Sequence, residues 1–522
     1  MASAAQGRAP GAAPQANAPL EDVAQLKARN PVLLIVGIMT ASLLQVLDIT
    51  IANVAIPHMQ STLGASPDTI SWVLTSYIIA SAVAMPITGW LADRIGSRRL
   101  FLISVTMFVA ASMLCGLAQS LEQMVLFRAL QGVGGAFIAP LSQSSLLDTT
   151  RPSRQPQIIA LWGMGVMIGP ILGPVLGGWL TETMTWRWVF FVNVPVGAIC
   201  IAILLAELPS REIRQRRFDL FGFAMIGLAL ASLQLLLDRG NHVDWFSSME
   251  TWIYTAMTVS AAWVALIHLA TNADPLFDRA LFKDVNFVVA LAFMVVVGVV
   301  MFATMALLPP MLQTLFRYDV IDTGLVLMPR GVGVLISMQI SGLLMRKGVD
   351  ARWLVAVGFL IGAWSLHAMA LWSLEADRWH FVSTGLLQGL GIGLVFIPLN
   401  ATAFSTLPPH LRTDGSSLLN LMRSVGSSIG ISVVMTLLAR DIQRNHEEIG
   451  ASLTGQMSTA FDLSTLDRFQ QYGSAAMTIA DAEVTRQAAM IAYLNDFEMM
   501  KWMSLAAVPL VFVMRRSPRY GR

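Results

Sequence analysis

Long apolar runs separated by short polar segments dominate the chain. A helix needs about 20 mostly apolar residues to cross the hydrocarbon core of a bilayer. Read with a window of about 19 residues, the chain contains fourteen runs of this kind, over residues 32–56, 69–90, 99–119, 122–147, 156–181, 187–207, 219–237, 251–271, 285–309, 322–345, 352–373, 380–406, 414–438 and 497–514. The pattern predicts an all-α polytopic membrane protein with fourteen transmembrane helices.

A short glycine motif occurs in the fourth run and again in the twelfth. The first copy is Gln131-Gly132-Val133-Gly134 and the second is Gln388-Gly389-Leu390-Gly391. A weaker echo links Gly89, before the loop after the second run, with Gly342, before the loop after the tenth. Both echoes are displaced by eight helices, so a six-helix repeat requires two inserted helices. We expect two six-helix pseudo-repeat bundles with the seventh and eighth helices inserted between them.

This organisation divides the chain into five parts. They are a disordered cytoplasmic tail (1–30), an N-terminal six-helix bundle (31–208), the inserted pair (209–272), a C-terminal six-helix bundle (273–514) with a long external loop (439–496), and a second cytoplasmic tail (515–522). Arginines gather in the loops after the second, fourth, sixth and tenth runs and in the C-terminal tail. Basic loops stay on the cytoplasmic side. We therefore expect both termini to be cytoplasmic.

Composition agrees with a lipid environment. The chain is 55% hydrophobic and 13% charged, whereas soluble domains carry about 25% charged residues. A net charge of +2 gives no reason to expect nucleic-acid binding. Cys115 and Cys200 lack the spacing of a disulfide framework or a metal site, and the histidines are scattered.

The sequence contains neither the HExxH motif of metalloproteases nor the P-loop of ATP-driven pumps. We therefore expect neither catalysis nor a cofactor. Energy for transport would then come from an ion gradient, worth about 2.3 kcal/mol per charge per 100 mV. Protons are the coupling ion that we expect.

Asp48 and Arg128 are charged residues inside apolar runs. A carboxylate at the centre of a membrane helix costs roughly 2.5 to 3.5 kcal/mol on insertion scales. Asp48 is either a proton-coupling group or one half of a fixed ion pair with Arg128. The position equivalent to Arg128 in the second repeat is Gly385, so we expect the charge chemistry to be concentrated in the first half.

The loop after the second run combines glycines with charges. Gly residues permit close helix contact and tight turns, and an acid there can pair with an arginine of another segment. We interpret the loop as part of a cytoplasmic gate, and Arg423 in the thirteenth run as a candidate partner. The gate residues are Gly89, Asp93, Arg94, Gly96, Arg98 and Arg423.

The fifth run contains glycines at spacings of four and two prolines. Glycines at this spacing make a flat face for close helix packing, and proline removes a backbone hydrogen bond. We expect this helix to act as a hinge at the interface of the two halves. The hinge residues are Gly165, Gly169, Pro170, Gly173, Pro174, Gly177 and Gly178.

Polar, aromatic and methionine side chains in the runs are candidates for a substrate cavity. Most residues of these types pack in cores or face lipid, and Arg330 either lines a cavity or snorkels outward. The cavity candidates are Gln45, Asn53, Trp162, Met301, Arg330, Trp364, Phe396 and Asn400.

The motifs together resemble those of the major facilitator superfamily. The loop from Gly89 to Arg99 is similar to the signature between its second and third helices, Arg128 with Gln131-Gly132 to its fourth-helix motif, and the run from Gly165 to Gly178 to its antiporter motif. Three further segments resemble the fourteen-helix drug/proton antiporters of the EmrB/QacA type, above all EmrB. They are Leu47 to Pro57, Trp186 to Pro195, and Leu237 to Gly240.

The resemblance implies a proton-coupled multidrug efflux transporter of the inner membrane. Its substrates would be amphipathic toxic compounds from the cytoplasm or the lipid, with a periplasmic adaptor and an outer-membrane channel as partners where the cell has them. Contact with an adaptor would fall in the segment 439–496. A dedicated exporter of one natural product, fatty acid or siderophore is the alternative, and a non-transporting membrane sensor or scaffold is the alternative of another class.

Overall fold

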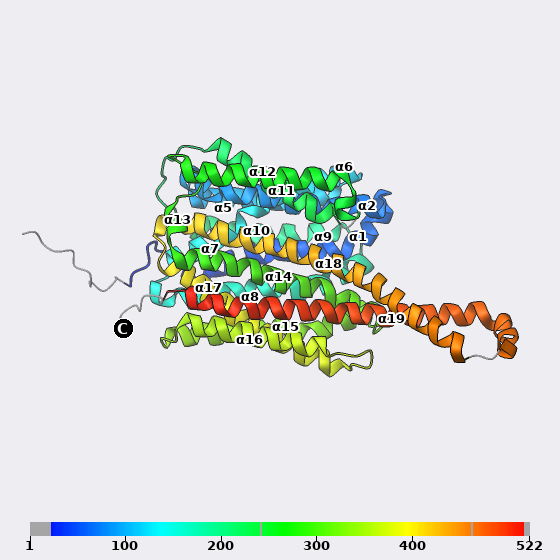
Figure 1. The fold of residues 1–522 in the computed structure, drawn as a ribbon. Helices are drawn as coiled ribbons and strands as arrows, with labels where there is room; N and C mark the ends of the chain where they lie inside the picture. The colour runs from blue at the N-terminus through cyan, green and yellow to red at the C-terminus, as the bar shows by residue number, and fades with distance from the viewer. Residues whose placement is uncertain (1–21, 241–242, 461–462, 516–522) are drawn as a thin grey trace, which may run out of the picture.

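The computed structural model describes residues 22–240, 243–460 and 463–515, and the regular structure within them is entirely helical (Figure 1). The expected tails at 1–30 and 515–522 therefore fall largely outside the described residues. Thirteen helices in the described residues are long and apolar enough to cross a membrane. The fourteenth expected helix, over 497–514, coincides with the C-terminal part of α19 (Leu463–Leu510). Glu498 and Lys501 lower its apolar character.

The N-terminal bundle contains six long helical units, several of them broken by a turn. They are formed by α1 (Pro31–Leu63), α2 (Pro67–Ile70), α3 (Trp72–Ala84), η1 (Met85–Ile87), α4 (Thr88–Ile95), α5 (Ser97–Leu117), α6 (Leu121–Ala136), α7 (Ile138–Thr149), η2 (Pro152–Arg154), α8 (Gln155–Thr183), α9 (Trp188–Phe191) and α10 (Asn193–Glu207). The inserted pair comprises α11 (Leu220–Arg239), η3 (Trp245–Ser247) and α12 (Met249–Thr271).

The C-terminal bundle follows the same order of long helices. It contains α13 (Ala280–Lys283), α14 (Val285–Thr314), α15 (Val320–Arg346), α16 (Ala351–Ala370), α17 (Arg378–Ser405), η4 (Pro409–Leu411), α18 (Arg412–Ala460), α19 and η5 (Val511–Val513). Both ends of the described chain lie at the same end of the bundle (Figure 1). That placement requires an even number of crossings, which agrees with the thirteen apolar helices plus α19.

Local sequence explains where several helices begin. Asn30 caps α1 by accepting a hydrogen bond from the backbone N–H of Leu33 at 3.2 Å, and Gly64 ends the helix in the left-handed conformation. An aspartate side chain likewise caps α11, α14, α15, α16 and α17. Such caps satisfy backbone donors that the helix itself leaves free and place negative charge at the positive end of the helix dipole.

The two copies of the glycine motif pack in corresponding ways. A Cβ at Gly132 on α6 would lie 2.5 Å from the carbonyl oxygen of Tyr77 on α3, and a Cβ at Gly389 on α17 would overlap the carbonyl oxygen of Arg330 on α15. These positions admit only glycine because another backbone occupies the space of a side chain. The correspondence places α3 and α6 of the first half in the same relation as α15 and α17 of the second.

The next glycine of each motif repeats the correspondence. A Cβ at Gly134 would lie 2.9 Å from the backbone nitrogen of Phe108 on α5, and a Cβ at Gly391 would lie 2.8 Å from the carbonyl oxygen of Gly358 on α16. The internal repeat expected from the sequence is therefore a repeat of packing.

The inserted pair contacts both halves. Helix α11 packs on α12 and on α3 of the first half. On the other side, Ser432 of α18 donates a hydrogen bond to the carbonyl oxygen of Leu237 at 2.7 Å, and the Trp245 indole donates to Thr436 at 3.0 Å. Helix α11 thus lies against α3 and α18. Helix α12 packs on α11 (Figure 1).

The segment 439–496, which we expected to be an external loop, is helical except at the undescribed residues 461–462. Helices α18 and α19 contain 49 and 48 residues and project together beyond the other helices (Figure 1). His446 and Asp481 lie 3.0 Å apart across this hairpin, and Asn445 donates to the carbonyl oxygen of Ala488 at 3.3 Å. The segment has no proline and is rich in alanine and glutamine, so its intrinsic preference is for helix.

Candidate functional site: a buried charge centre and a cytoplasmic latch

Asp48 and Arg128 meet inside the N-terminal bundle. Both side chains are fully buried, and Arg128 Nη1 lies 2.6 Å from Asp48 Oδ2. Helix α1 supplies the acid and α6 the base. The expected proximity is therefore present in the structure, whereas proton coupling remains a prediction.

Two amides complete the surroundings of the carboxylate. Gln131 Nε2 donates to Asp48 Oδ1 at 2.8 Å, and Asn193 Nδ2 donates to the same oxygen at 2.7 Å. Gln131 lies one turn after Arg128 on α6, and Asn193 begins α10. Three helices thus hold one carboxylate, which offsets the cost of burying its charge.

The guanidinium of Arg128 is held on several sides. Its Nε donates to the carbonyl oxygen of Val73 at 3.1 Å, and its Nη1 also donates to Gln131 Oε1 at 2.8 Å. The ring of Tyr77 lies 4.6 Å from its central carbon, a cation–π distance. Arg128 Nη2 and Asn193 Oδ1 have no hydrogen-bond partner among the described residues. The centre therefore retains capacity for a further polar group.

Sequence reasoning did not assign Gln131 or Asn193 to this centre. Gln131 was considered only as part of the repeated glycine motif and of the fourth-helix motif, and Asn193 only as part of a segment that resembles a family. An amide in a membrane helix needs a partner, and Gln131 is three residues from Arg128, on the same face of its helix. That spacing could have identified Gln131, whereas only the packing of α10 on α1 and α5 reveals Asn193.

The second half has a counterpart of this centre that contains no ion pair among the described residues. Gln388 Nε2, at the position equivalent to Gln131, donates to Thr304 Oγ1 on α14 at 3.1 Å. Arg330 lies beside Gly385, and its Nη2 donates to the carbonyl oxygen of Met301 at 2.9 Å. Arg330 is thus directed into the protein interior rather than outward to the membrane surface.

The predicted gate loop contacts both the inserted segment and the second half. Arg216, between α10 and α11, bonds Asp93 at 3.3 Å and Asp414 on α18 at 2.9 Å. A Cβ at Gly89 would overlap the Asp414 carboxylate, and Gly96 has a φ of +90° that favours glycine. We call the ion pairs of Arg216 with Asp93 and Asp414 the latch.

The remaining gate candidates have different positions. Arg94 stacks over the Trp90 ring at 5.9 Å, and Arg98 donates to the carbonyl oxygen of Leu205 at 2.6 Å. Arg423 does not make the expected contact with the loop. Its guanidinium donates to Asn420 on its own helix at 3.1 Å, because Arg423 is more than two turns further along α18 than Asp414.

A second set of contacts joins the halves near the latch. Asp148 at the end of α7 accepts hydrogen bonds from Arg412 at 3.3 Å and from Arg211. Gln143 donates to Asn400 at 2.7 Å, deeper between α7 and α17. Asn400, expected in a substrate cavity, is therefore part of the seam between the halves.

The glycine face of the predicted hinge helix packs on α1. Positions 165, 169, 173 and 177 of α8 each lie so close to α1 that a Cβ would touch Met39, Val46, Thr50 or Ile51. Thr50 also donates to the carbonyl oxygen of Gly169 at 3.3 Å. A Cβ at Gly178 would have no other atom within 4 Å, so Gly178 is not part of this close contact. Pro170 and Pro174 lie inside the helix. Movement at this hinge remains a prediction.

The other cavity candidates do not form one cluster. Trp364 is 66% exposed on the outer face of α16, so its assignment to the cavity is wrong. Trp162 is buried and donates to Ser42 at 2.9 Å. Of the remaining candidates, Gln45, Met301 and Phe396 are buried, and Asn53 is exposed.

The sequence of the chain matches one protein family and several transporters. The sequence profile of the Major Facilitator Superfamily matches residues 38–431. The chain is 34% identical over 509 residues to the multidrug export protein EmrB of Escherichia coli K12, which covers 95% of this chain and 97% of that protein. It is 33% identical over 485 residues to the fatty acid resistance protein FarB of Neisseria gonorrhoeae, with 91% and 94% covered.

Solved structures show the same fold. The human organic anion transporter MFSD10 matches with a TM-score of 0.59 at 13% identity, covering 92% of this chain and 99% of that one. The proton:xylose symporter XylE matches with a TM-score of 0.60 at 11% identity, covering 93% and 96%.

Proposed function

The chain belongs to the major facilitator superfamily and is a membrane transporter, not an enzyme; from this premise we propose that it exports amphipathic toxic compounds in exchange for protons. The observation that carries the proposal is the buried centre of Asp48, Arg128, Gln131 and Asn193. A carboxylate with a cation and two amides from other helices can lose these partners when the helices move apart.

The proton would bind when the centre opens. With Arg128 in place, the ionised carboxylate is the favourable form because an opposite charge lies next to it. If α1 separates from α6, the buried carboxylate loses its cation, and protonation becomes the less costly state. Alternating access would thereby couple the position of the halves to the proton.

We place the termini and the latch in the cytoplasm of an inner membrane. Segments with two or more arginines, at 94–99, 151–154, 211–217 and 346–352, lie at one end of the bundle by the order of the helices. The latch and the contacts of Asp148 would then close the cytoplasmic side. In this reading the structure has the cytoplasmic gate shut.

The hairpin of α18 and α19 is the surface that we assign to an adaptor. It projects from the end of the bundle opposite the termini (Figure 1), which is the periplasmic side in our orientation. Two adjacent helices that project beyond the rest of the bundle suit pairing with another helical protein. An outer-membrane channel would be reached through that adaptor.

A dedicated exporter is the second candidate, and a relative with a narrower name favours it. FarB is named for resistance to fatty acids. Overexpression followed by susceptibility testing with unrelated dyes, antibiotics and fatty acids separates the two candidates. Resistance to one chemical class alone would favour the dedicated exporter.

The test of the proposed function uses purified protein in liposomes. An imposed pH gradient should drive uptake of a cationic dye in inside-out vesicles, and adding the dye should release protons in the opposite direction. A protein that moves no substrate from the panel under any gradient would instead be a sensor or a scaffold.

A further inference from the structure

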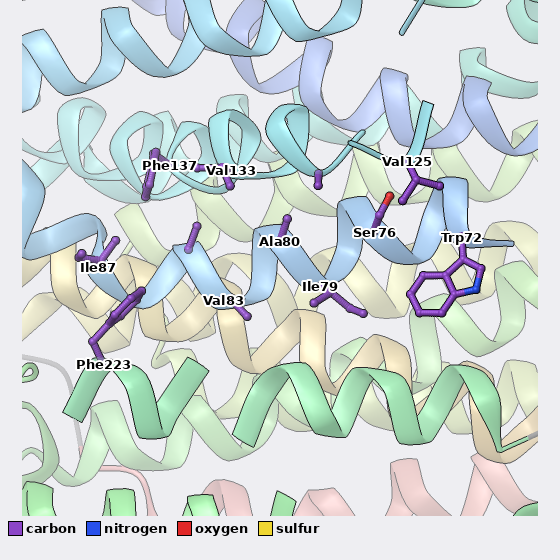
Figure 2. A pocket seen from close by; sticks show the side chains of 12 residues that line it. Trp72, Ser76, Ile79, Ala80, Val83, Ile87, Val125, Val133, Phe137 and Phe223 are labelled. Atoms are coloured by element: carbon purple, nitrogen blue, oxygen red, sulfur yellow. The ribbon is translucent and has the colours of Figure 1, made fainter. Parts of the chain in front are cut away.

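An apolar groove follows the outer face of α3, where α6 and α11 flank it (Figure 2). Its volume is about 600 Å³. Trp72 lies at one end of the groove, and Ile87 and Phe223 lie at the other (Figure 2). The walls between these ends include Ile79, Val83, Val125 and Val133.

The length of the groove suits an extended apolar chain. Residues 72 to 87 of the α3–η1 segment span about 22 Å at the rise of a helix, which exceeds the roughly 15 Å that one leaflet contributes to the hydrocarbon core. Leu126 and Leu130 on the adjacent surface of α6 are 58% and 43% exposed. Their exposure indicates that the groove opens toward lipid rather than toward the interior of the bundle.

A basic pocket of about 590 Å³ continues the groove at the end marked by Ile87. Helix α4 extends the line of η1, so that Trp90 follows Ile87 by one turn. The rings of Trp90 and Phe218 are 4.5 Å apart, and Phe218 is 5.8 Å from Phe223 at the groove end. The pocket is lined by Trp90, Arg94, Gln215, Arg216, Arg217 and Phe218.

The pocket contains uncompensated positive charge. Arg216 is bonded to the two acids of the latch. Arg94 and Arg217 are exposed, and neither has an acidic partner within the described part of the chain. A groove without charge thus leads into a pocket with two guanidinium groups that have no acidic partner among the described residues. Guanidinium groups bind phosphate in a planar, bidentate geometry.

We propose that this groove and pocket bind one anionic phospholipid, with an acyl chain along α3 and its phosphate at Arg94 and Arg217. The cytoplasmic leaflet supplies such lipids, and juxtamembrane arginines attract them. The proposal rests on the orientation given under the proposed function, which places the pocket at that leaflet. Since Arg216 lines the same pocket, the headgroup lies directly beside the latch.

The inserted helices give the site its third wall. Without α11 the groove would be an open furrow between α3 and α6, and without the segment before α11 the pocket would lack Arg217 and Phe218. The site is therefore a property of the fourteen-helix arrangement. It is separate from the buried centre, because Arg128 is bonded to Val73 and Asp48 on the inner side of these helices.

Native mass spectrometry of the delipidated full chain in detergent tests the proposal. Phosphatidylglycerol and phosphatidylcholine with identical acyl chains serve as probes. We expect the wild type to retain phosphatidylglycerol at a concentration about 30-fold lower than phosphatidylcholine, which is the effect of two arginines near a surface. Equal retention of the two lipids would overturn the proposal.

Two variants separate the headgroup from the chain. Arg94→Gln/Arg217→Gln should abolish the preference for phosphatidylglycerol, whereas the matched control Arg99→Gln/Arg346→Gln, which removes two exposed arginines outside the pocket, should keep it. Val83→Trp, which fills the groove, should weaken retention of both lipids alike. A preference that survives the first double variant would contradict the assignment of the phosphate.

Competition with a fatty acid tests whether the anionic group bound by the pocket is a carboxylate rather than a phosphate. If oleate displaced phosphatidylglycerol with the same dependence on Arg94 and Arg217, the site would belong to a carboxylated amphiphile, and the lipid assignment would be wrong. Binding is measured without a gradient and without transport. A failed transport assay therefore leaves this inference standing, and a failed binding assay leaves the proposed function standing.

Discussion

The buried centre of the first half and its counterpart in the second half have similar packing and different chemistry. Gln131 donates to a carboxylate, that of Asp48, whereas Gln388 donates to a hydroxyl, that of Thr304. The position of Arg128 is occupied by Gly385 in the second half. One half thus contains a buried ion pair where the other contains a neutral hydrogen bond.

The two halves share their packing glycines but not their charged side chains. Glycines that bring two backbones together occur in both halves, because the same pairs of helices pack closely in each. The charged side chains lie beside these contacts and are not needed for them. A buried ion pair can therefore be confined to one half while both halves keep the same helix packing.

Replacing Asp48 tests the comparison most strongly. In Asp48→Asn we expect proton-driven accumulation of substrate to fall to the uncoupled level, roughly 50-fold at 100 mV if one proton drives one cycle. Thr304→Val, at the corresponding place in the second half, should leave coupling intact. Proton release on substrate addition in liposomes measures both. Coupled transport in Asp48→Asn would remove the distinction between the halves.

Replacing Arg128 tests the ion pair itself. Arg128→Met leaves a buried carboxylate without its cation, and breaking a buried pair costs about 3 to 5 kcal/mol. We expect a clear loss of thermal stability, and partial recovery in Asp48→Asn/Arg128→Met because the unpaired charge is gone. A double-mutant cycle from thermal unfolding in detergent gives the coupling energy. Additive effects of the two changes would argue against a strong pair.

The loops after the second and tenth helices extend the comparison to the cytoplasmic side. Asp93 is part of the latch, whereas the corresponding loop of the second half contains Arg346, which is exposed. We expect Asp93→Asn to increase labelling of a cysteine placed at Ser417, about tenfold for the loss of one partly exposed charged hydrogen bond. Arg346→Gln should not change the labelling. Equal labelling in both variants would show that the loops are not asymmetric.

The inserted pair has no counterpart in either half. A substitution there, at Asp219, is expected to have the smallest effect on stability. Burial would raise the pKa of Asp219, but hydrogen bonds from the Gly222 N–H and His268 hold it below its usual value. A lowered pKa contributes stability above the unfolded value of 3.8, and this stability is lost as the pH falls through the folded pKa. Asp219→Asn should therefore lose about 1 kcal/mol at pH 7, because hydrogen bonds to a charged acceptor are stronger than those to a neutral one, and this loss should shrink as the pH falls below 3.8. A pH-independent difference in unfolding would contradict this assignment.

The sequence located the charge centre but only half of its members. Asp48 and Arg128 stand out because charges inside apolar helices are costly. Asn193 is uncharged, and nothing in its own helix indicates that α10 brings it within 2.7 Å of Asp48. The latch was likewise half predicted, because Asp93 was visible in its loop and its partner Arg216 comes from a segment 123 residues away.

Two wrong expectations have a common origin. The segment 439–496 was read as a loop because it is polar, yet polarity excludes a membrane span and does not exclude a helix. Trp364 was read as a cavity residue because it is aromatic, yet the packing of α16 on α17 and α19 leaves it outside. Hydropathy reports the environment of a segment and not its partners.

By itself the sequence determined the membrane environment, the number of helices, the repeat and the place of Asp48 and Arg128 in the first half. These follow from hydropathy, helix geometry and the cost of burying charge, all of which act within one segment. The tertiary structure alone decided which side chains meet: Asn193 with Asp48, Arg216 with Asp414, and α11 with the groove on α3. Those contacts depend on how separate helices are placed against one another, and that placement results from packing along their whole length.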